Sequence, residues 1–157
     1  MKTEKVKKDK SIRPHVVAVL IFAVVMAVII SIPILQHRQF LRFVSDFSRI
    51  TTRTETKNVV YCEYNGEDVL LDADQKANIY RQLVYSEQKR RAVPTEEIAA
   101  EGMTVTYGIL ATLTLAPAEY KGEEALYVEY HSENMDYTYL APHLKYATFE
   151  NILKGYL

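Results

Sequence analysis

The hydrophobic pattern begins with one long apolar run near the start of the chain. Residues 16–35 (VVAVLIFAVVMAVIISIPIL) carry no charge and depart from apolar character only at Ser31 and Pro33. As a helix that rises ~1.5 Å per residue, this run covers ~30 Å, the hydrocarbon thickness of a bilayer. A domain of this size has no interior that could surround such a run on every side. We therefore predict a transmembrane helix over residues 16–35, with the lipid bilayer as its partner.

The flanks of this run indicate an uncleaved signal-anchor. Residues 1–15 form a basic tail with six Lys/Arg, but the apolar run exceeds the ~7–15 residues of a signal-peptide core. No small-residue cleavage site follows it, because the chain continues as QHRQ. Six Lys/Arg before the run against four in residues 36–53 favour a cytoplasmic N-terminus and an extracytoplasmic C-terminal domain. The reverse topology would make the chain a cytoplasm-facing adaptor.

Residues 36–54 form a juxtamembrane segment with a helical apolar stripe. The stripe places aromatic and aliphatic side chains three or four residues apart, at Phe40, Phe43, Val44, Phe47 and Ile50. Either an interfacial helix on the bilayer or a helix docked on the following domain accounts for it, and a dimer seam is less favoured because the stripe is short. The polar run TTRTET at residues 51–56 predicts a linker, with the domain over residues 55–157.

Alternating and helical patterns in residues 55–157 predict an α+β domain. Asn65-Gly66 favours the positive φ angles of a type I′ turn and predicts a hairpin. Asp72, three residues before Gln75, predicts a capping box that opens a helix reaching about residue 91. The predicted order is ββαβββα, one antiparallel sheet with two helices: strands 58–64, 67–71, 103–115, 125–131 and 135–140, and helices from 73 and 148.

The clearest predicted strand is residues 103–115 (MTVTYGILATLTL). Its apolar side chains alternate with threonines, so one face is expected to be buried. That face carries Met103, Val105, Tyr107, Ile109, Ala111, Leu113 and Leu115. Gly108 within the run indicates a bulge. After Pro117 we predict a turn through residue 124, and Thr148 is expected to cap the last helix.

Charge divides the chain into two parts. Residues 1–53 carry 10 Lys/Arg and 3 Asp/Glu, a net of +7, and residues 54–157 carry 9 and 17, a net of −8. An acidic domain disfavours nucleic-acid binding, which needs a basic face. A single Cys excludes an internal disulfide framework and suits an oxidising compartment. The chain has no N-x-S/T sequon, which favours a bacterial membrane protein.

No catalytic motif stands out in the sequence. Cys62 lies in a predicted strand without a nearby histidine and is expected to be a small buried hydrophobe. His131 and His143 lack metalloprotease spacing, and a metal site of His131 with Glu129 and Asp136 is disfavoured. We predict no cofactor, no metal and no enzymatic activity. The alternative is a membrane-tethered hydrolase that uses the carboxylates of Glu129 and Asp136.

Tyrosine distribution points to a candidate partner-binding face. All 12 tyrosines follow residue 60, and Tyr127, Tyr137 and Tyr139 recur on the last predicted hairpin. Half-exposed tyrosines are enriched at protein contacts, although cross-strand aromatic pairing that stabilises the sheet explains the same pattern. The sequence therefore predicts a single-pass membrane protein that presents a small acidic binding or interaction domain to a protein or cell-envelope partner.

Overall fold

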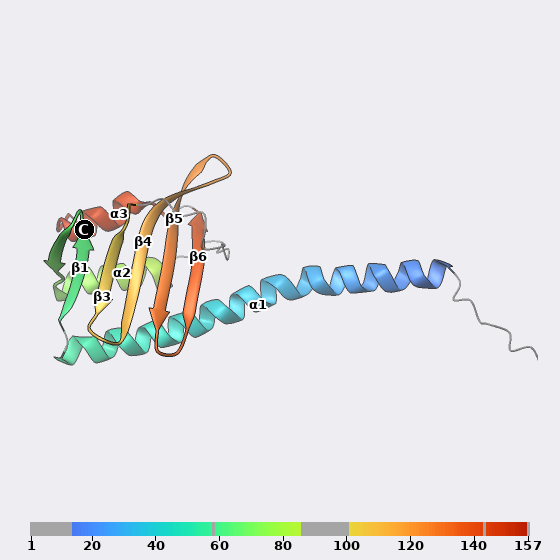
Figure 1. Ribbon diagram of the computed structural model, residues 1–157, viewed down its shortest axis with the longest axis horizontal. Helices are drawn as coiled ribbons and strands as arrows, with labels where there is room; N and C mark the ends of the chain where they lie inside the picture. The colour runs from blue at the N-terminus through green and yellow to red at the C-terminus, as the bar shows by residue number, and fades with distance from the viewer. Residues whose placement is uncertain (1–13, 58, 86–100, 143, 157) are drawn as a thin grey trace, which may run out of the picture. The chain divides into compact units, whose positions relative to one another are not determined.

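The computed structural model describes residues 14–57, 59–85, 101–142 and 144–156 (Figure 1). The chain divides into two units, Met1–Leu35 and Gln36–Leu157. The basic tail before residue 14, the predicted helix and loop over residues 86–100, and His143 lie outside the described residues.

Helix α1 (Pro14–Lys57) contains the long apolar run. Its most apolar stretch is not buried by any described part of the chain, and Phe22 is 66% exposed. The hydroxyl of Ser31 donates to the Ala27 carbonyl at 2.6 Å, so this polar group is satisfied within the helix. In length and composition, α1 is a helix that could cross a membrane.

The second unit is an α+β fold, as the alternation predicts. Among the described residues, six antiparallel strands form one open sheet in the order β2-β1-β3-β4-β5-β6 (Figure 1). The strands are β1 (Val60–Tyr64), β2 (Glu67–Leu70), β3 (Met103–Tyr107), β4 (Ala111–Tyr120), β5 (Glu123–Ser132) and β6 (Asp136–Pro142). The part of this unit that the structure describes also contains helices α2 (Ala73–Val84) and α3 (Tyr146–Leu153).

Two local predictions are confirmed. Asn65 and Gly66 have φ angles of 53° and 78°, as the type I′ turn between β1 and β2 requires. Asp72 accepts from the Gln75 backbone N–H, and the Gln75 side chain accepts from Asp72, which completes the capping box of α2. Gln75 also donates to the last carbonyls of α3 at Ile152 and Leu153, so the same residue ties the two helices together.

The predicted strand over residues 103–115 is two strands, which corrects the count from five to six. The chain turns at Gly108, which has a φ of +56°, and Tyr107 then pairs with Ala111. Ile109 lies at the tip of this turn and is fully exposed, so its predicted place on the buried face is wrong. The remaining apolar residues of that face are buried as expected.

Two element boundaries also differ from the prediction. β4 continues through Pro117 to Tyr120, and the turn to β5 is at Lys121-Gly122, where both residues have positive φ. Pro117 is accommodated at a half-buried position of β4, where a turn was predicted. α3 begins at Tyr146 after the N-cap residue Lys145, so Thr148 lies inside the helix rather than at its cap.

The core lies between one face of the sheet and the helices. Phe40, Phe43, Phe47 and Ile50 of α1 are buried in the same cluster as Ile79 of α2 and Phe149 of α3, and as inward-facing residues of the strands. The domain-docking interpretation of residues 36–54 is therefore confirmed, and this segment belongs to the compact unit. The predicted linker at 51–56 is wrong, because α1 continues to Lys57.

Candidate binding pocket between two helices

The three tyrosines predicted as a partner-binding face do not form an exposed surface. Tyr137 and Tyr139 are 7% and 0% exposed, and both rings pack against Phe43 of α1 at centroid distances of 5.5 and 5.9 Å. Tyr127 is 2% exposed and lies in a separate small cluster with Ala116, Ala125 and Leu140. Because neighbouring residues of a strand alternate, Tyr127 faces the side of the sheet away from the helices. The structure thus favours the sheet-stabilising interpretation.

The carboxylates of the alternative enzyme lie on the face of the sheet away from the helices. Glu129 pairs in register with Thr138 and accepts from the Tyr127 hydroxyl at 3.3 Å. Asp136 is exposed and forms an ion pair with His131 directly across from it. Across the described part of the chain, no group of three His, Cys, Asp or Glu side chains could hold a metal ion.

Cys62 is fully buried on the helix-covered face of β1. Burial, followed by the nearby charge of Glu63, raises the pKa of its thiol to about 12, so it is protonated at neutral pH. The prediction of a small buried hydrophobe is confirmed.

We expect maleimide to modify Cys62 only after denaturation, because the thiol is both buried and protonated. Intact-mass spectrometry before and after denaturation measures this. Tyr61→Cys in a Cys62→Ala background is the matched control, since Tyr61 is 44% exposed and should be modified in the native state. Fast native labelling of Cys62 would contradict the prediction.

Asp46 is the centre of a hydrogen-bonded cluster that sequence reasoning missed. Its carboxylate accepts from Arg49 at 2.6 Å, Ser132 at 2.7 Å, Tyr130 at 2.8 Å and Asn134 at 3.1 Å. Burial alone would raise the pKa of Asp46, but the hydrogen bonds and the Arg49 charge outweigh it and hold this pKa below its usual value. The cluster fastens α1 to β5 and to the turn before β6.

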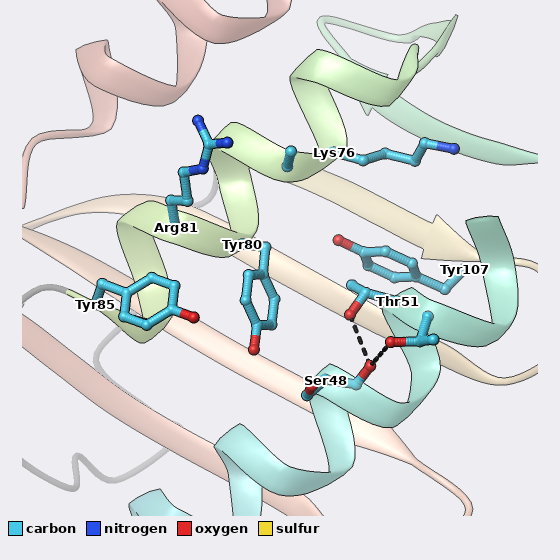
Figure 2. A pocket seen from close by; sticks show the side chains of 9 residues that line it. Ser48, Thr51, Lys76, Tyr80, Arg81, Tyr85 and Tyr107 are labelled. Carbon is cyan, nitrogen blue, oxygen red and sulfur yellow. Dashed lines mark hydrogen bonds between the residues drawn. The ribbon is translucent and has the colours of Figure 1, made fainter.

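One pocket lies between α1 and α2, near the end of β3 (Figure 2). The cavity measures about 240 Å³. α1 contributes hydroxyl side chains, α2 together with its C-cap residue contributes two basic and two aromatic residues, and β3 contributes one tyrosine. The lining residues are Ser48, Thr51, Thr52, Lys76, Ala77, Tyr80, Arg81, Tyr85 and Tyr107.

The lining of this pocket combines hydroxyl groups with positive charge. Thr51 and Thr52 both donate to the Ser48 carbonyl, at 3.0 and 2.9 Å, which holds their side chains against α1. Lys76 and Arg81 are the charged members of the lining, and no acidic side chain belongs to it. In Figure 2 the Arg81 guanidinium points away from the Tyr80 and Tyr107 rings. The Lys76 ammonium group likewise lies away from the Tyr80 ring and the Tyr107 hydroxyl (Figure 2).

Tyr107 lines the pocket and has a buried hydroxyl. Its side chain is 0% exposed, and its hydroxyl has no hydrogen-bond partner among the residues that the structure describes. Burial, followed by repulsion from the neighbouring Tyr130 and Cys62, raises the pKa of Tyr107 far above its usual value. The group is thus a neutral O–H donor. Phe47 holds the ring edge-on at 5.5 Å, and the hydroxyl points toward the side of the pocket where Tyr80 lies (Figure 2).

Sequence reasoning missed this pocket because three distant segments build it. The sequence predicts a linker over the segment that contains Thr51 and Thr52, and it predicts Tyr107 to be a core residue of a strand. The only local signal was a tyrosine, which carries a polar atom, at the end of an otherwise aliphatic buried face.

Comparisons with protein-family models, curated proteins and solved structures each find no match.

Proposed function

We propose that this chain is a single-pass, signal-anchored membrane protein that holds a small ligand-binding domain outside the cytoplasm. The observation that carries the proposal is the exposed apolar stretch of α1. Large side chains such as Val19 and Phe22 are both 66% exposed, and a lipid environment would remove this surface from water. The Ser31 hydroxyl already bonds within the helix, as burial in hydrocarbon requires.

The orientation follows from the flanking charges. Six Lys/Arg precede the apolar run, against Arg38, Arg42, Arg49 and Arg53 after it. The side with more positive residues stays in the cytoplasm, which directs the domain outward. A domain with one buried cysteine also tolerates an oxidising compartment, because its thiol is inaccessible.

The role as a binding domain rests on the pocket between α1 and α2. Concave sites with a few convergent polar groups are where small ligands bind. The hydroxyl-rich and basic lining fits recognition of a ligand by hydrogen bonds. The acidic outer domain would present this pocket to molecules outside the cytoplasm.

Paired reporters fused after residue 157 test the topology. One reporter is active only outside the cytoplasm and the other only inside, and we expect activity of the outside reporter alone. Alkaline extraction of the membranes should leave the protein in the pellet, since an apolar helix of this length is held by the bilayer. Activity of the inside reporter alone, or release by alkali, would overturn the proposal.

Two charge variants provide the matched controls. Replacing the six Lys/Arg of residues 1–15 with Gln removes the charge bias and should send a measurable share of molecules into the reverse orientation. Replacing Arg38 and Arg42 with Gln strengthens the bias and should leave the outside reporter fully active.

A further inference from the structure

We propose that a groove between α1 and the turn before β6 binds the phosphate group of a phosphoester, with Arg42, Ser45 and Arg49 as its donors. The groove measures about 810 Å³ and lies within the second unit. Five residues of α1, from Gln39 to Arg49, line it together with residues 134–137. The inference goes beyond the binding role proposed for the pocket between α1 and α2, because it concerns a different surface.

The first support is a row of donors on one face of α1. Arg42, Ser45 and Arg49 are three and four residues apart, so they share one face of the helix. All three are exposed and line the groove. Neither Arg42 nor Ser45 has a hydrogen bond or an ion pair with any residue that the structure describes. Arg49 donates from one guanidinium nitrogen to Asp46, which leaves other N–H groups of its fork for a ligand.

The second support is that the carboxylates of the lining are already engaged. Asp46 accepts four hydrogen bonds, two at each oxygen, and a carboxylate has about four acceptor positions. Asp136 also lines the groove, but it pairs with His131 across the face of the sheet away from the helices. Since Asp46 balances the charge of Arg49, the positive charge of Arg42 is left for a ligand. The groove therefore favours an anion that accepts several hydrogen bonds.

A phosphate group fits these donors better than a carboxylate does. It carries up to two negative charges and three strong acceptor oxygens. The planar fork of an arginine matches phosphate oxygens, and the long side chains of Arg42 and Arg49 can converge over the Ser45 hydroxyl between them. The groove is many times larger than the ~30 Å³ of one water, so it has room for the organic body of a phosphoester beside the phosphate.

Contacts across the groove hold its two sides together. Asn134 donates to Asp46 at 3.1 Å, and the Tyr137 ring packs against Phe43 at a centroid distance of 5.5 Å. Both contacts join α1 to the segment that contains the turn and β6. The groove is thus formed before a ligand arrives, which lowers the entropy that binding costs.

A phospholipid headgroup and a soluble phosphoester carry the same group, and the position of Arg42 favours the lipid. Arg42 follows Leu35, the last residue of the apolar run, by seven residues of α1, or about 10 Å of helix. The interfacial region extends about 5–8 Å beyond the hydrocarbon, and a long arginine side chain covers the difference. This choice of source rests on the proposed membrane anchor, whereas the phosphate site itself does not.

The test uses the full chain in dodecyl maltoside micelles, which contain no phosphate, titrated by calorimetry at about 0.15 M salt. The probes form two pairs that differ in the phosphate: glycerol phosphate with glycerol, and a short-chain phosphatidic acid with the matching diacylglycerol. We expect saturable binding of glycerol phosphate in the millimolar range and at least about 10-fold tighter binding of phosphatidic acid, because the micelle concentrates the lipid beside the groove.

The pattern of binding identifies the source. Tighter binding of phosphatidic acid assigns a lipid headgroup, and equal or tighter binding of glycerol phosphate keeps the phosphate site but assigns a soluble phosphoester. Absence of saturable binding by both phosphate probes would overturn the proposal, and so would equal binding of each probe and its partner that lacks phosphate.

Variants assign the donors. Arg42→Gln should weaken binding of glycerol phosphate about 10-fold, and Ser45→Ala about 3-fold or more, because they remove a charged and a neutral donor. Arg53→Gln is the matched control, since Arg53 is an exposed arginine of the same helix that does not line the groove. Unchanged binding by Arg42→Gln would overturn the assignment, as would an equal loss in Arg53→Gln.

A stability measurement separates ligand binding from a structural role of Arg42. Without ligand, Arg42→Gln should unfold at the same denaturant concentration as the wild type, because Arg42 has no partner among the described residues. A clear loss of stability would mean that Arg42 serves the fold, and this too would overturn the proposal. None of these outcomes depends on the topology reporters, so the phosphate site can fail while the membrane anchor stands.

Discussion

A chain that begins at residue 55 will fail to fold, whereas one that begins at Gln36 will form the native domain. Residues 36–57 of α1 place Phe40, Phe43, Phe47 and Ile50 in the core. Burying each such side chain contributes about 1.5–3 kcal/mol, so the four sum to roughly 6–12 kcal/mol. This is comparable to the whole ~5–15 kcal/mol by which a typical domain is stable.

The comparison is measured by near-ultraviolet circular dichroism and by amide dispersion in NMR spectra of the two fragments. Residues 36–157 should give a dispersed spectrum and a cooperative unfolding transition. Residues 55–157 should give a collapsed spectrum or aggregate, because the helix-facing side of the sheet loses its cover. A cooperatively folded 55–157 fragment would contradict the domain boundary at residue 36.

A point substitution tests the same packing without truncation. Phe43 is 0% exposed and meets Phe47, Tyr130, Tyr137 and Tyr139 with ring centroids 5.1–5.9 Å apart. Phe43→Ala should therefore lower the free energy of unfolding by about 3–5 kcal/mol. Leu41→Ala on the same helix is the control, since Leu41 is 51% exposed and should change stability by less than about 0.5 kcal/mol.

Asp46→Ala should destabilise the domain by about 2–4 kcal/mol at neutral pH. The substitution leaves Tyr130, Ser132 and Asn134 without the carboxylate that accepts from them. Hydrogen bonds to a charged acceptor contribute about 1.5–3 kcal/mol, and partners left buried add a desolvation cost. Chemical denaturation of the wild type and the variant at pH 7 measures the difference.

The same cluster sets a pH dependence. The folded-state pKa of Asp46 lies below its ordinary value of 3.8. The stabilisation that the charged carboxylate gives the folded state is therefore fully present above pH 3.8. The contribution is lost as pH falls through the lowered folded pKa. The stability gap between wild type and Asp46→Asn should therefore be constant from pH 7 to about pH 5 and narrow in more acidic solution.

Asp136→Asn is the control for this titration. Asp136 is 79% exposed and pairs with an exposed His131, and exposed ion pairs contribute little. Asp136→Asn should change the free energy of unfolding at pH 7 by no more than about 1 kcal/mol. If the difference in unfolding free energy between the wild type and Asp46→Asn persists unchanged below pH 3, the cluster does not depend on the charged carboxylate.

Short-range patterns predicted the elements that short-range contacts determine. The Asn65-Gly66 turn and the Asp72 cap depend on residues within three positions of each other, and both are as predicted. At Gly108 the sequence predicts a bulge within one strand, whereas the chain turns there between two strands, and the difference has a specific reason. Tyr107 and Ala111 pair across the turn and are an even number of residues apart, so the alternation runs through the hairpin unchanged.

The burial of each sheet face and the position of the pocket depend on contacts between residues far apart in the chain, which local patterns do not predict. The period-2 pattern places Tyr137 and Tyr139 on one face but does not say that α1 covers that face. The apolar stripe of α1 predicts a buried helix face but does not indicate what covers it. From the sequence, the bilayer and the following domain are therefore equal alternatives as its partner. The pocket joins Thr51, Lys76 and Tyr107, which no local pattern connects.

The link between Asp46 and the C-terminal hairpin also determines when this domain can fold in the cell. Asp46 precedes Ser132 and Asn134 by 86 and 88 residues. At a synthesis rate of ~5–20 residues per second, Ser132 and Asn134 are therefore made ~4–18 s after Asp46. The hydrogen bonds between Asp46 and the β5–β6 hairpin therefore form only after synthesis is almost complete. A ribosome that stalls before β5 leaves Phe43 of α1 without the tyrosines that pack against it, Tyr130, Tyr137 and Tyr139.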